Sequence, residues 1–110
     1  MNQRVRVAVM FGGKSVEHEI SVISGLQAVY AMNTEKYQPV PVYIAKNGQM
    51  YAGGNVGEIE AYADIDKLTK TAARVNLVCE NNRFYLKRQN TKAFSKNIIS
   101  EVDVAMPVVH

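Results

Sequence analysis

A short apolar run that is stopped by two glycines and followed by a helical pattern constrains this fold most. The run covers residues 7–11 and is rich in β-branched side chains, which is typical of a buried strand. Gly12 and Gly13 end it, and Ser15 can cap a helix that the pattern extends over about residues 16–32. Strand, turn and helix form the first half of a βαβ unit, and such folds bind ligands at the carboxyl ends of their strands.

The glycine turn matches neither of two common phosphate-binding motifs. Gly13-Lys14-Ser15 has the tail of a Walker A loop, but the first glycine of that motif would fall on Ala8. The G-x-G-x-x-G fingerprint also fails, because Gly12 and Gly13 are adjacent and no third glycine follows in place. A nucleotide-binding role for this turn would therefore depend on fold class alone.

One face of the predicted helix is small and polar. Glu17, Ser21, Ser24, Gly25 and Ala28 share this face by their spacing. A glutamate in the first turn can simply complement the helix dipole, which is worth roughly 0.3–1 kcal/mol. A glycine inside a helix costs about 1 kcal/mol relative to alanine, so Gly25 indicates close approach of another backbone or of a ligand. Both a structural and a functional role for Glu17 stay open at this point.

The rest of the chain predicts further strands and two hairpins. Residues 39–45 read as a strand, and the two prolines place its first half at a sheet edge. Asn47-Gly48 is a strong turn signal that returns the chain into residues 49–52. The remaining predictions are short helices over residues 58–73, a hairpin of residues 75–79 and 83–87 that turns at Asn81-Asn82, a short helix or loop over residues 91–100, and a last buried strand over residues 102–109.

Composition excludes several classes of protein. A chain of 110 residues predicts one domain, and a net charge of +3 is too small to indicate a nucleic-acid partner. The single cysteine, Cys79, cannot form an intrachain disulfide, suits a reducing cytoplasm and is predicted to be a small buried thiol. No run approaches the roughly 18 apolar residues of a membrane span, and no signal peptide is visible.

Two stretches resemble one known family. The run F-G-G-K-S-V-E-H-E-I-S-V-I-S-G, residues 11–25, resembles the N-terminal signature of the D-alanine:D-alanine ligases, ATP-grasp enzymes of peptidoglycan precursor synthesis. The closing run V-D-V-A-M-P-V-V-H, residues 102–110, resembles the strand that leads into the His-Gly motif of that family. The resemblance implies a small Rossmann-like, pre-ATP-grasp α/β domain with a parallel central sheet and attached β-hairpins, in which the last strand lies parallel beside the first.

The resemblance also implies a reaction and a set of site residues. Such a ligase phosphorylates the carboxylate of one D-alanine with ATP and Mg2+ (or Mn2+), and the amine of a second D-alanine then displaces the phosphate. By position in the motif, Glu17 and His110 would be catalytic, with Glu17 holding the ammonium of the first D-alanine and His110 lying near its carboxyl group. Ile20 would touch the substrate methyl. Loop support would come from Gly12, Gly13, Ser15, Ser21 and Ser24. Plain alternatives are core packing for Ile20 and no role for His110.

The family further implies that residues 1–110 are the N-terminal, substrate-binding part of a longer enzyme. ATP and the metal would be bound by central and C-terminal domains that this sequence lacks, so no metal site is expected here and the isolated domain is predicted to be inactive. A helix that is apolar on more than one side predicts a homodimer. Alternatives are a ligase that joins D-alanine to D-serine or D-lactate, and a stand-alone Rossmann-like binding module.

Overall fold

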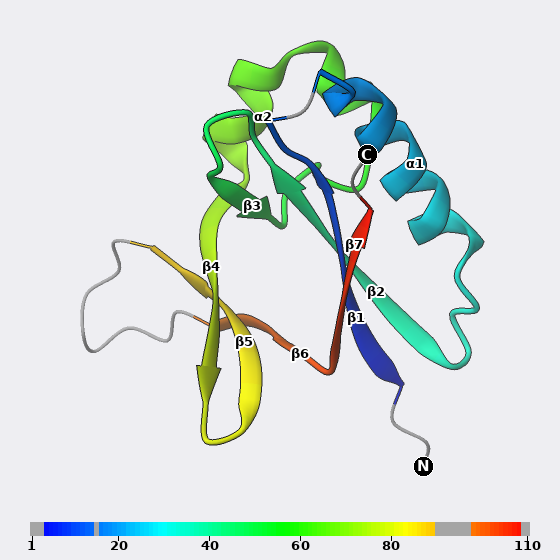
Figure 1. The fold of residues 1–110 in the computed structure, drawn as a ribbon, viewed down its shortest axis with the longest axis vertical. Helices are drawn as coiled ribbons and strands as arrows, with labels where there is room; N and C mark the ends of the chain where they lie inside the picture. The colour runs from blue at the N-terminus through cyan, green and yellow to red at the C-terminus, as the bar shows by residue number, and fades with distance from the viewer. Residues whose placement is uncertain (1–3, 15, 90–97, 109–110) are drawn as a thin grey trace.

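A single curled sheet organises the molecule. The computed structural model describes residues 4–14, 16–89 and 98–108, and within them seven strands pair in the order β6-β5-β4-β3-β2-β1-β7 (Figure 1). The strands are β1 (Val5–Gly12), β2 (Tyr37–Ile44), β3 (Met50–Ala52), β4 (Ala73–Glu80), β5 (Arg83–Arg88), β6 (Ile98–Val102) and β7 (Val104–Val108). The helices are α1 (His18–Ala31), the 3-10 helix η1 (Ile59–Ala63) and α2 (Ile65–Thr71).

The centre of the sheet is parallel. Strand β1 runs parallel to both neighbours, with Met10 opposite Val42 of β2 and opposite Pro107 of β7. Its apolar run is buried on both faces, as Ala8 and Val9 are both fully inaccessible to solvent. Both the predicted α/β fold with a parallel centre and the predicted pairing of the first and last strands are therefore confirmed.

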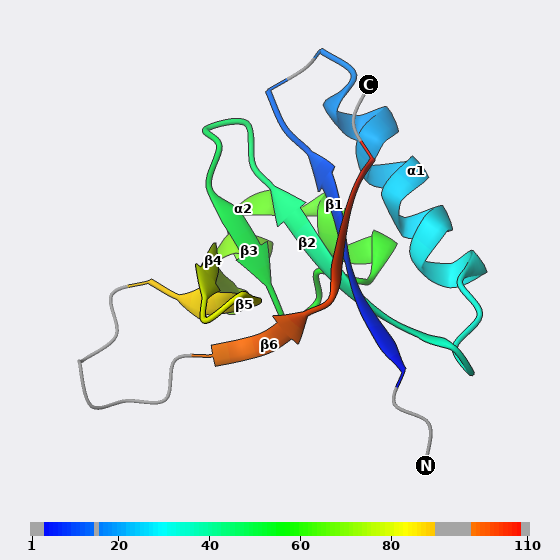
Figure 2. The same cartoon turned by 60° about the horizontal axis from the view of Figure 1, so that its bottom comes forward.

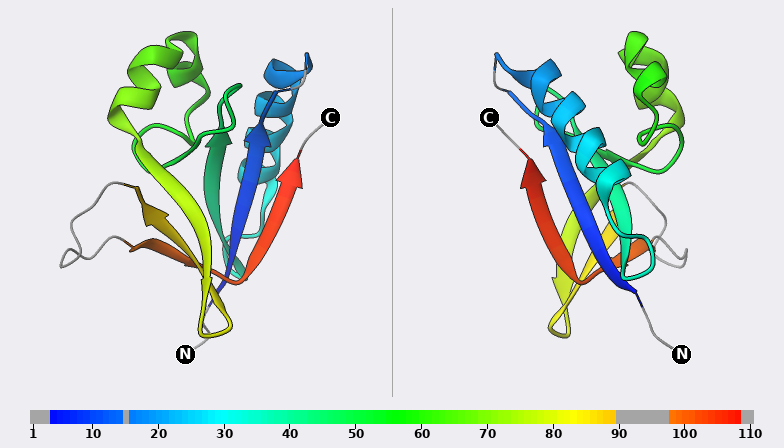
Figure 3. Two further views of the ribbon diagram at one scale, coloured as in Figure 1. Left: turned by 60° about the vertical axis from the view of Figure 1, so that its left-hand side comes forward. Right: turned by 90° about the vertical axis from the view of Figure 1, so that its right-hand side faces the viewer.

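Each face of the sheet covers its own core. Val9 and Phe11 point to the face that α1 and α2 cover, where Leu26 and Leu68 pack against them. Figure 3 shows α1 lying along β1 on this face, and α2 standing beyond the carboxyl end of β2. Ala8 points the other way, into a second core that the antiparallel strands β4, β5 and β6 close by curling over it (Figure 2).

The predicted hairpins form where the turn residues placed them. The chain turns at Asn47-Gly48 between β2 and β3, and at Asn81-Asn82 between β4 and β5. On β2, strand β3 pairs only with Val42–Ile44, so among the described residues the half of β2 that contains both prolines has β1 alone as a neighbour. The predicted edge position of that half is thus confirmed. The short helices predicted for residues 58–73 are η1 and α2.

Three predictions about the type or the ends of helices and strands are wrong. The helix begins at His18 with Glu17 as its N-cap residue, rather than at residue 16 behind a Ser15 cap, and Ser15 lies outside the described residues. Residues 98–100 belong to β6, not to a helix or loop. The predicted last strand is broken at Asp103, whose carboxylate accepts a hydrogen bond from the Arg6 backbone N–H at 2.8 Å and turns the chain from β6 into β7.

The exposure of Cys79 also differs from the prediction. Cys79 is exposed rather than buried, and it lies near the hairpin turn, where β4 has run past β3, which pairs with it at Ala73–Val75. On α1, Ile20 and Ile23 are about half exposed, at 55% and 49%, and do not pack on the sheet. The inward face of α1 carries instead His18, Ser21, Val22, Gly25 and Leu26.

Candidate functional site

The carboxyl ends of three strands meet at the start of α1. Gly12 ends β1, Ile44 ends β2 and Val108 ends β7, and all three point toward the same edge of the sheet (Figure 3). The Gly13 N–H donates to the Ile44 carbonyl at 2.8 Å, which ties the turn to β2. This edge is where α/β folds of this kind place their ligands.

Ser21 joins the same turn to β7. Its Oγ accepts a hydrogen bond from the Gly12 N–H at 3.0 Å and donates one to the Val108 carbonyl. Ser21 is fully buried, so these two backbone groups have a fixed partner away from water. One hydroxyl on α1 therefore holds the ends of two parallel strands.

Gly12 cannot be replaced without moving the turn. Its φ of +96° is a conformation that L-residues rarely adopt, and a Cβ there would lie 2.3 Å from the Ile44 carbonyl oxygen. Gly13 also has a positive φ, but open space surrounds the position of its Cβ. The tight approach of β1 to β2 thus depends on Gly12, while a side chain at Gly13 would meet open space.

Glu17 lies on the exposed side of this edge. It is the N-cap residue of α1, its carbonyl accepts the Ser21 N–H at 2.9 Å, and its side chain makes no capping hydrogen bond to the helix. Ile20 follows one turn later and is 55% exposed, so core packing does not explain it. Ser24 is half buried. His110 and Ser15 lie outside the described residues, so their place in the site stays a prediction.

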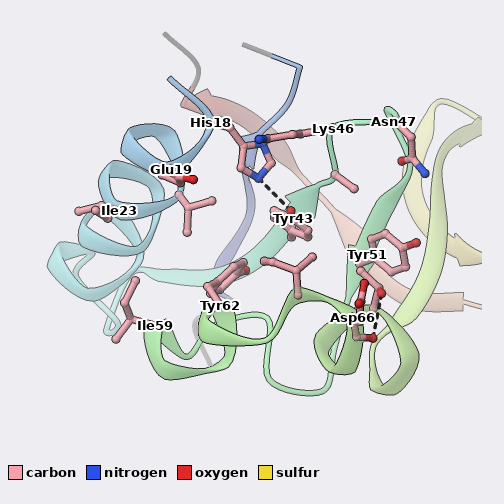
Figure 4. Close-up of a pocket in the computed structure, with 14 residues that line it drawn as sticks. His18, Glu19, Ile23, Tyr43, Lys46, Asn47, Tyr51, Ile59, Tyr62 and Asp66 are labelled. Carbon is pink, nitrogen blue, oxygen red and sulfur yellow. Dashed lines mark hydrogen bonds between the residues drawn. The ribbon is translucent and has the colours of Figure 1, made fainter. Parts of the chain in front are cut away.

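Sequence reasoning missed the most closely held side chain of this edge, which is His18. Its Nδ1 lies 2.5 Å from the Gly13 carbonyl oxygen, and its Nε2 lies 2.8 Å from the Tyr43 hydroxyl on β2. His18 is 5% exposed, and Figure 4 shows its ring directed from α1 toward Tyr43. The spacing of His18, Ser21 and Gly25 at i, i+3 and i+7 was the available signal that the imidazole faces inward.

A pocket of about 590 Å³ lies on the other side of His18. It separates α1 from η1 and α2, with β2 and β3 beneath (Figure 4). Its wall includes three tyrosines, Tyr43, Tyr51 and Tyr62, and the Tyr62 hydroxyl donates to the Val56 carbonyl at 2.7 Å. Burial raises the pKa of Tyr62 and of Tyr43, so both hydroxyls stay protonated. Glu17 and Ile20 do not line this pocket, so the predicted substrate contacts lie outside it.

Two further observations concern metal binding and membrane crossing. Within residues 4–14, 16–89 and 98–108, no group of three or more His, Cys, Asp or Glu side chains could hold a metal ion. None of the helices in that part of the chain has the length and apolar character to cross a membrane.

Comparison with known proteins identifies the family of this domain. Residues 6–110 match the family described as D-ala D-ala ligase N-terminus. The chain belongs to this family. The D-alanine--D-alanine ligase of Acetivibrio thermocellus is 35% identical to it over 121 positions, which cover 100% of this chain and 31% of the relative. The corresponding ligase of Chlorobium phaeovibrioides is 33% identical over 111 positions, covering 98% and 29%. The chain thus spans less than a third of the length of these relatives.

Solved structures show the same fold for this D-ala D-ala ligase N-terminus domain. The D-alanine-D-alanine ligase of Coxiella burnetii matches with a TM-score of 0.69 at 22% identity, over 99% of this chain and 29% of that one. The VanG D-Ala:D-Ser ligase of Enterococcus faecalis matches with a TM-score of 0.68 at 24% identity, over 98% and 29%. At these identities the likeness concerns the fold, which agrees with the α/β sheet with a parallel centre predicted from the sequence.

Proposed function

We propose that this chain is the N-terminal, substrate-binding domain of an ATP-dependent D-alanine:D-alanine ligase of peptidoglycan precursor synthesis. The observation that carries the proposal is the Gly12-Gly13 turn, which is tied to three strand ends and presents an exposed Glu17, in a chain that belongs to this family. The parent enzyme would join two D-alanines and convert ATP to ADP and phosphate. A cytoplasmic location is part of the proposal, which the single cysteine supports.

The proposed role of Glu17 follows from the charge of the substrate. A D-alanine that reacts through its carboxylate keeps its ammonium, and an ammonium that leaves water needs a fixed anion. Glu17 offers a carboxylate at the sheet edge, and the exposed Ile20 one turn later offers an apolar contact for the methyl group. His110 is proposed to lie near the substrate carboxyl group, since it directly follows the last strand.

ATP and Mg2+ do not fit the residues described here. The Gly12-Gly13 turn matches no phosphate-binding motif, and the described residues contain no cluster of metal ligands. We therefore assign to this chain only the D-alanine side of the reaction. Both ATP and the metal belong to parts of the ligase beyond this sequence in our proposal.

The test is an assay of ADP release on the intact ligase that carries this domain. D-alanine should stimulate ADP release and yield D-alanyl-D-alanine, while the 110-residue chain alone should give only the buffer rate. D-serine and D-lactate, added with D-alanine, test the variant ligases, because one structural match is a D-Ala:D-Ser ligase. No dipeptide or depsipeptide product from the intact enzyme would overturn the proposal and favour a stand-alone binding module.

We also propose that this domain forms a homodimer through exposed apolar side chains of α1. Ile23 and Tyr30 are exposed there by 49% and 65%, and an apolar patch of this kind usually marks an interface. Sedimentation velocity should show a dimer at micromolar concentration, and Ile23→Asp should shift it to monomer. A chain that stays monomeric at every concentration up to the millimolar range would overturn this part of the proposal.

A further inference from the structure

A buried histidine lies between the turn that carries Glu17 and the tyrosine-lined pocket. His18 directly follows Glu17, and its ring is held on both sides, by the Gly13 carbonyl and by the Tyr43 hydroxyl. The ring of Tyr43 meets it edge-on, with 5.4 Å between ring centroids and an interplanar angle of 84°. Tyr43 is itself 1% exposed, so the pair has a fixed position in the core.

The contact with the Gly13 carbonyl places one proton on the ring. A carbonyl oxygen only accepts hydrogen bonds, so Nδ1 must carry a proton to bind Gly13. The Tyr43 hydroxyl can then donate to the bare Nε2, and each polar atom of the pair has a partner. With the proton on Nε2 instead, the lone pairs of Nδ1 and of the Gly13 oxygen would face each other at 2.5 Å.

These bonds close the loop that carries Glu17. Gly13 precedes Glu17 and His18 follows it, and the Gly13 carbonyl and the His18 side chain are joined by a hydrogen bond. The Gly13 N–H is tied in turn to the Ile44 carbonyl, one residue beyond Tyr43 on β2. The backbone of Glu17 is therefore held between α1 and β2, although its side chain is exposed.

We propose that His18, as the neutral Nδ1–H tautomer, and Tyr43 are positioning residues that fix the Gly13–His18 loop and so place the Glu17 carboxylate for the substrate ammonium. The role assigned to Glu17 depends on the proposed function, whereas the tautomer and the closed loop do not. His18 and Tyr43 are not assigned any direct contact with substrate.

The first experiment measures the tautomer on the chain itself. In a long-range 15N–1H spectrum of the neutral protein, Nδ1 of His18 should resonate as a protonated nitrogen and Nε2 as a bare one. The chain has two histidines, so His110→Ala assigns the signals. A proton on Nε2, or on both nitrogens, would overturn the proposal whatever the enzyme does.

The second experiment separates positioning from stability. Tyr43→Phe removes the donor to Nε2, and we expect amide exchange at Gly13 to become about tenfold faster and KM for D-alanine in the intact ligase to rise roughly twofold to tenfold, with kcat little changed. Tyr62→Phe is the matched control, because it removes another tyrosine hydroxyl of the same pocket, one that donates to the Val56 carbonyl at 2.7 Å and not to His18. It should lose similar stability and keep both values.

Conservative variants of the histidine complete the test. Asparagine carries its amide N–H at about the position of Nδ1 but does not reach Tyr43, so His18→Asn should change the Gly13 exchange and the D-alanine KM about as much as Tyr43→Phe does. Glutamine places its amide near Nε2 and loses the bond to Gly13, so His18→Gln should change both by more. Equal KM in all variants, or equal rises in Tyr43→Phe and Tyr62→Phe, would overturn positioning. If the intact enzyme makes no dipeptide, the proposed function fails, while the tautomer and exchange results still decide the closed loop.

Discussion

Gly25 of α1 lies directly against the ring of Phe11 of β1. A Cβ at Gly25 would come within 2.5 Å of three side-chain atoms of Phe11, closer than real Cβ contacts. The glycine therefore lets the helix approach the sheet until Phe11 is completely buried. The sequence indicated a close approach at Gly25, and the contact is a core aromatic ring rather than a backbone or a ligand.

Gly25→Ala should destabilise the domain. Alanine gains about 1 kcal/mol in helix propensity, but the methyl group overpacks the contact with Phe11, which typically costs about 1–3 kcal/mol. Because core atoms must move here, we expect this cost to exceed the gain in helix propensity. We expect a net loss of roughly 1–2 kcal/mol in the free energy of unfolding, measured by urea denaturation. Gln27→Ala, at an exposed position of the same helix, should change it by less than about 0.5 kcal/mol. A Gly25→Ala domain as stable as the parent would contradict the contact.

Ser21→Ala should weaken the attachment of β7 and the glycine turn. The substitution leaves the Gly12 N–H and the Val108 carbonyl without their shared partner, and each buried unpaired group of this kind costs about 1–3 kcal/mol. We expect a loss of at least about 1 kcal/mol in urea denaturation. Thr69→Ala removes a hydroxyl that binds the Asp66 carbonyl on an exposed helix, and should cost less than about 0.5 kcal/mol. Equal effects of the two substitutions would argue against this role of Ser21.

The turn between β4 and β5 requires residues that tolerate a positive φ. Asn81 and Asn82 have φ values of +53° and +64°, the pattern of a type I′ hairpin turn. Asn82→Val should lower the free energy of unfolding by about 1–2 kcal/mol, because a β-branched residue is poorly suited to this conformation. The free energy of unfolding of Asn82→Gly should stay within about 0.5 kcal/mol of the parent value. Thermal melts of both variants measure these differences. A valine variant that melts with the parent would show that the turn does not constrain the hairpin.

Local patterns were sufficient to predict the first strand and the two hairpin turns. The β1 run is apolar on both faces, and Asn47-Gly48 and Asn81-Asn82 fix hairpins through their own backbone preferences. The inward face of α1 was not predictable in this way, because apolar residues occur around most of the helix. Which of them faces the sheet depends on the fit of Gly25 to Phe11 and on the two bonds of Ser21.

Long-range contacts account for what the sequence did not show. The break at Asp103 depends on Arg6, which is 97 positions away in the chain. His18 belongs to the site edge only because β2 brings the Tyr43 hydroxyl to it, 25 positions later. The resemblance of the motif pointed to Glu17 and Ile20, but no local pattern shows which side chains hold their loop in place.

Asp103 should make stability depend on pH in the acidic range. The Arg6 backbone N–H, and then the Arg6 side chain, lower the pKa of this carboxyl group in the folded protein. A group with a lowered folded pKa stabilises the fold above its unfolded pKa of about 3.9, and loses this contribution as pH falls through the folded pKa. Asp103→Asn should therefore cost stability at pH 7, by less than about 1 kcal/mol for so exposed a pair, and the difference should shrink below about pH 4. A constant difference in urea denaturation from pH 7 to pH 2 would contradict this.

Glu17→Gln in the intact ligase tests the charge at the sheet edge. The amide keeps the shape of the side chain and removes its charge, and a hydrogen bond to a charged group is worth about 1.5–3 kcal/mol, so KM for the first D-alanine should rise by roughly one to two orders of magnitude. Stability should change by less than about 1 kcal/mol, because Glu17 makes no capping hydrogen bond and its interaction with the helix dipole is weak. Glu19→Gln, also exposed in the first turn of α1, is the control and should leave KM unaltered. Steady-state kinetics and a melting curve on each variant decide between the two roles of Glu17, since an unchanged KM beside a lowered melting temperature would leave it a residue of the helix start alone.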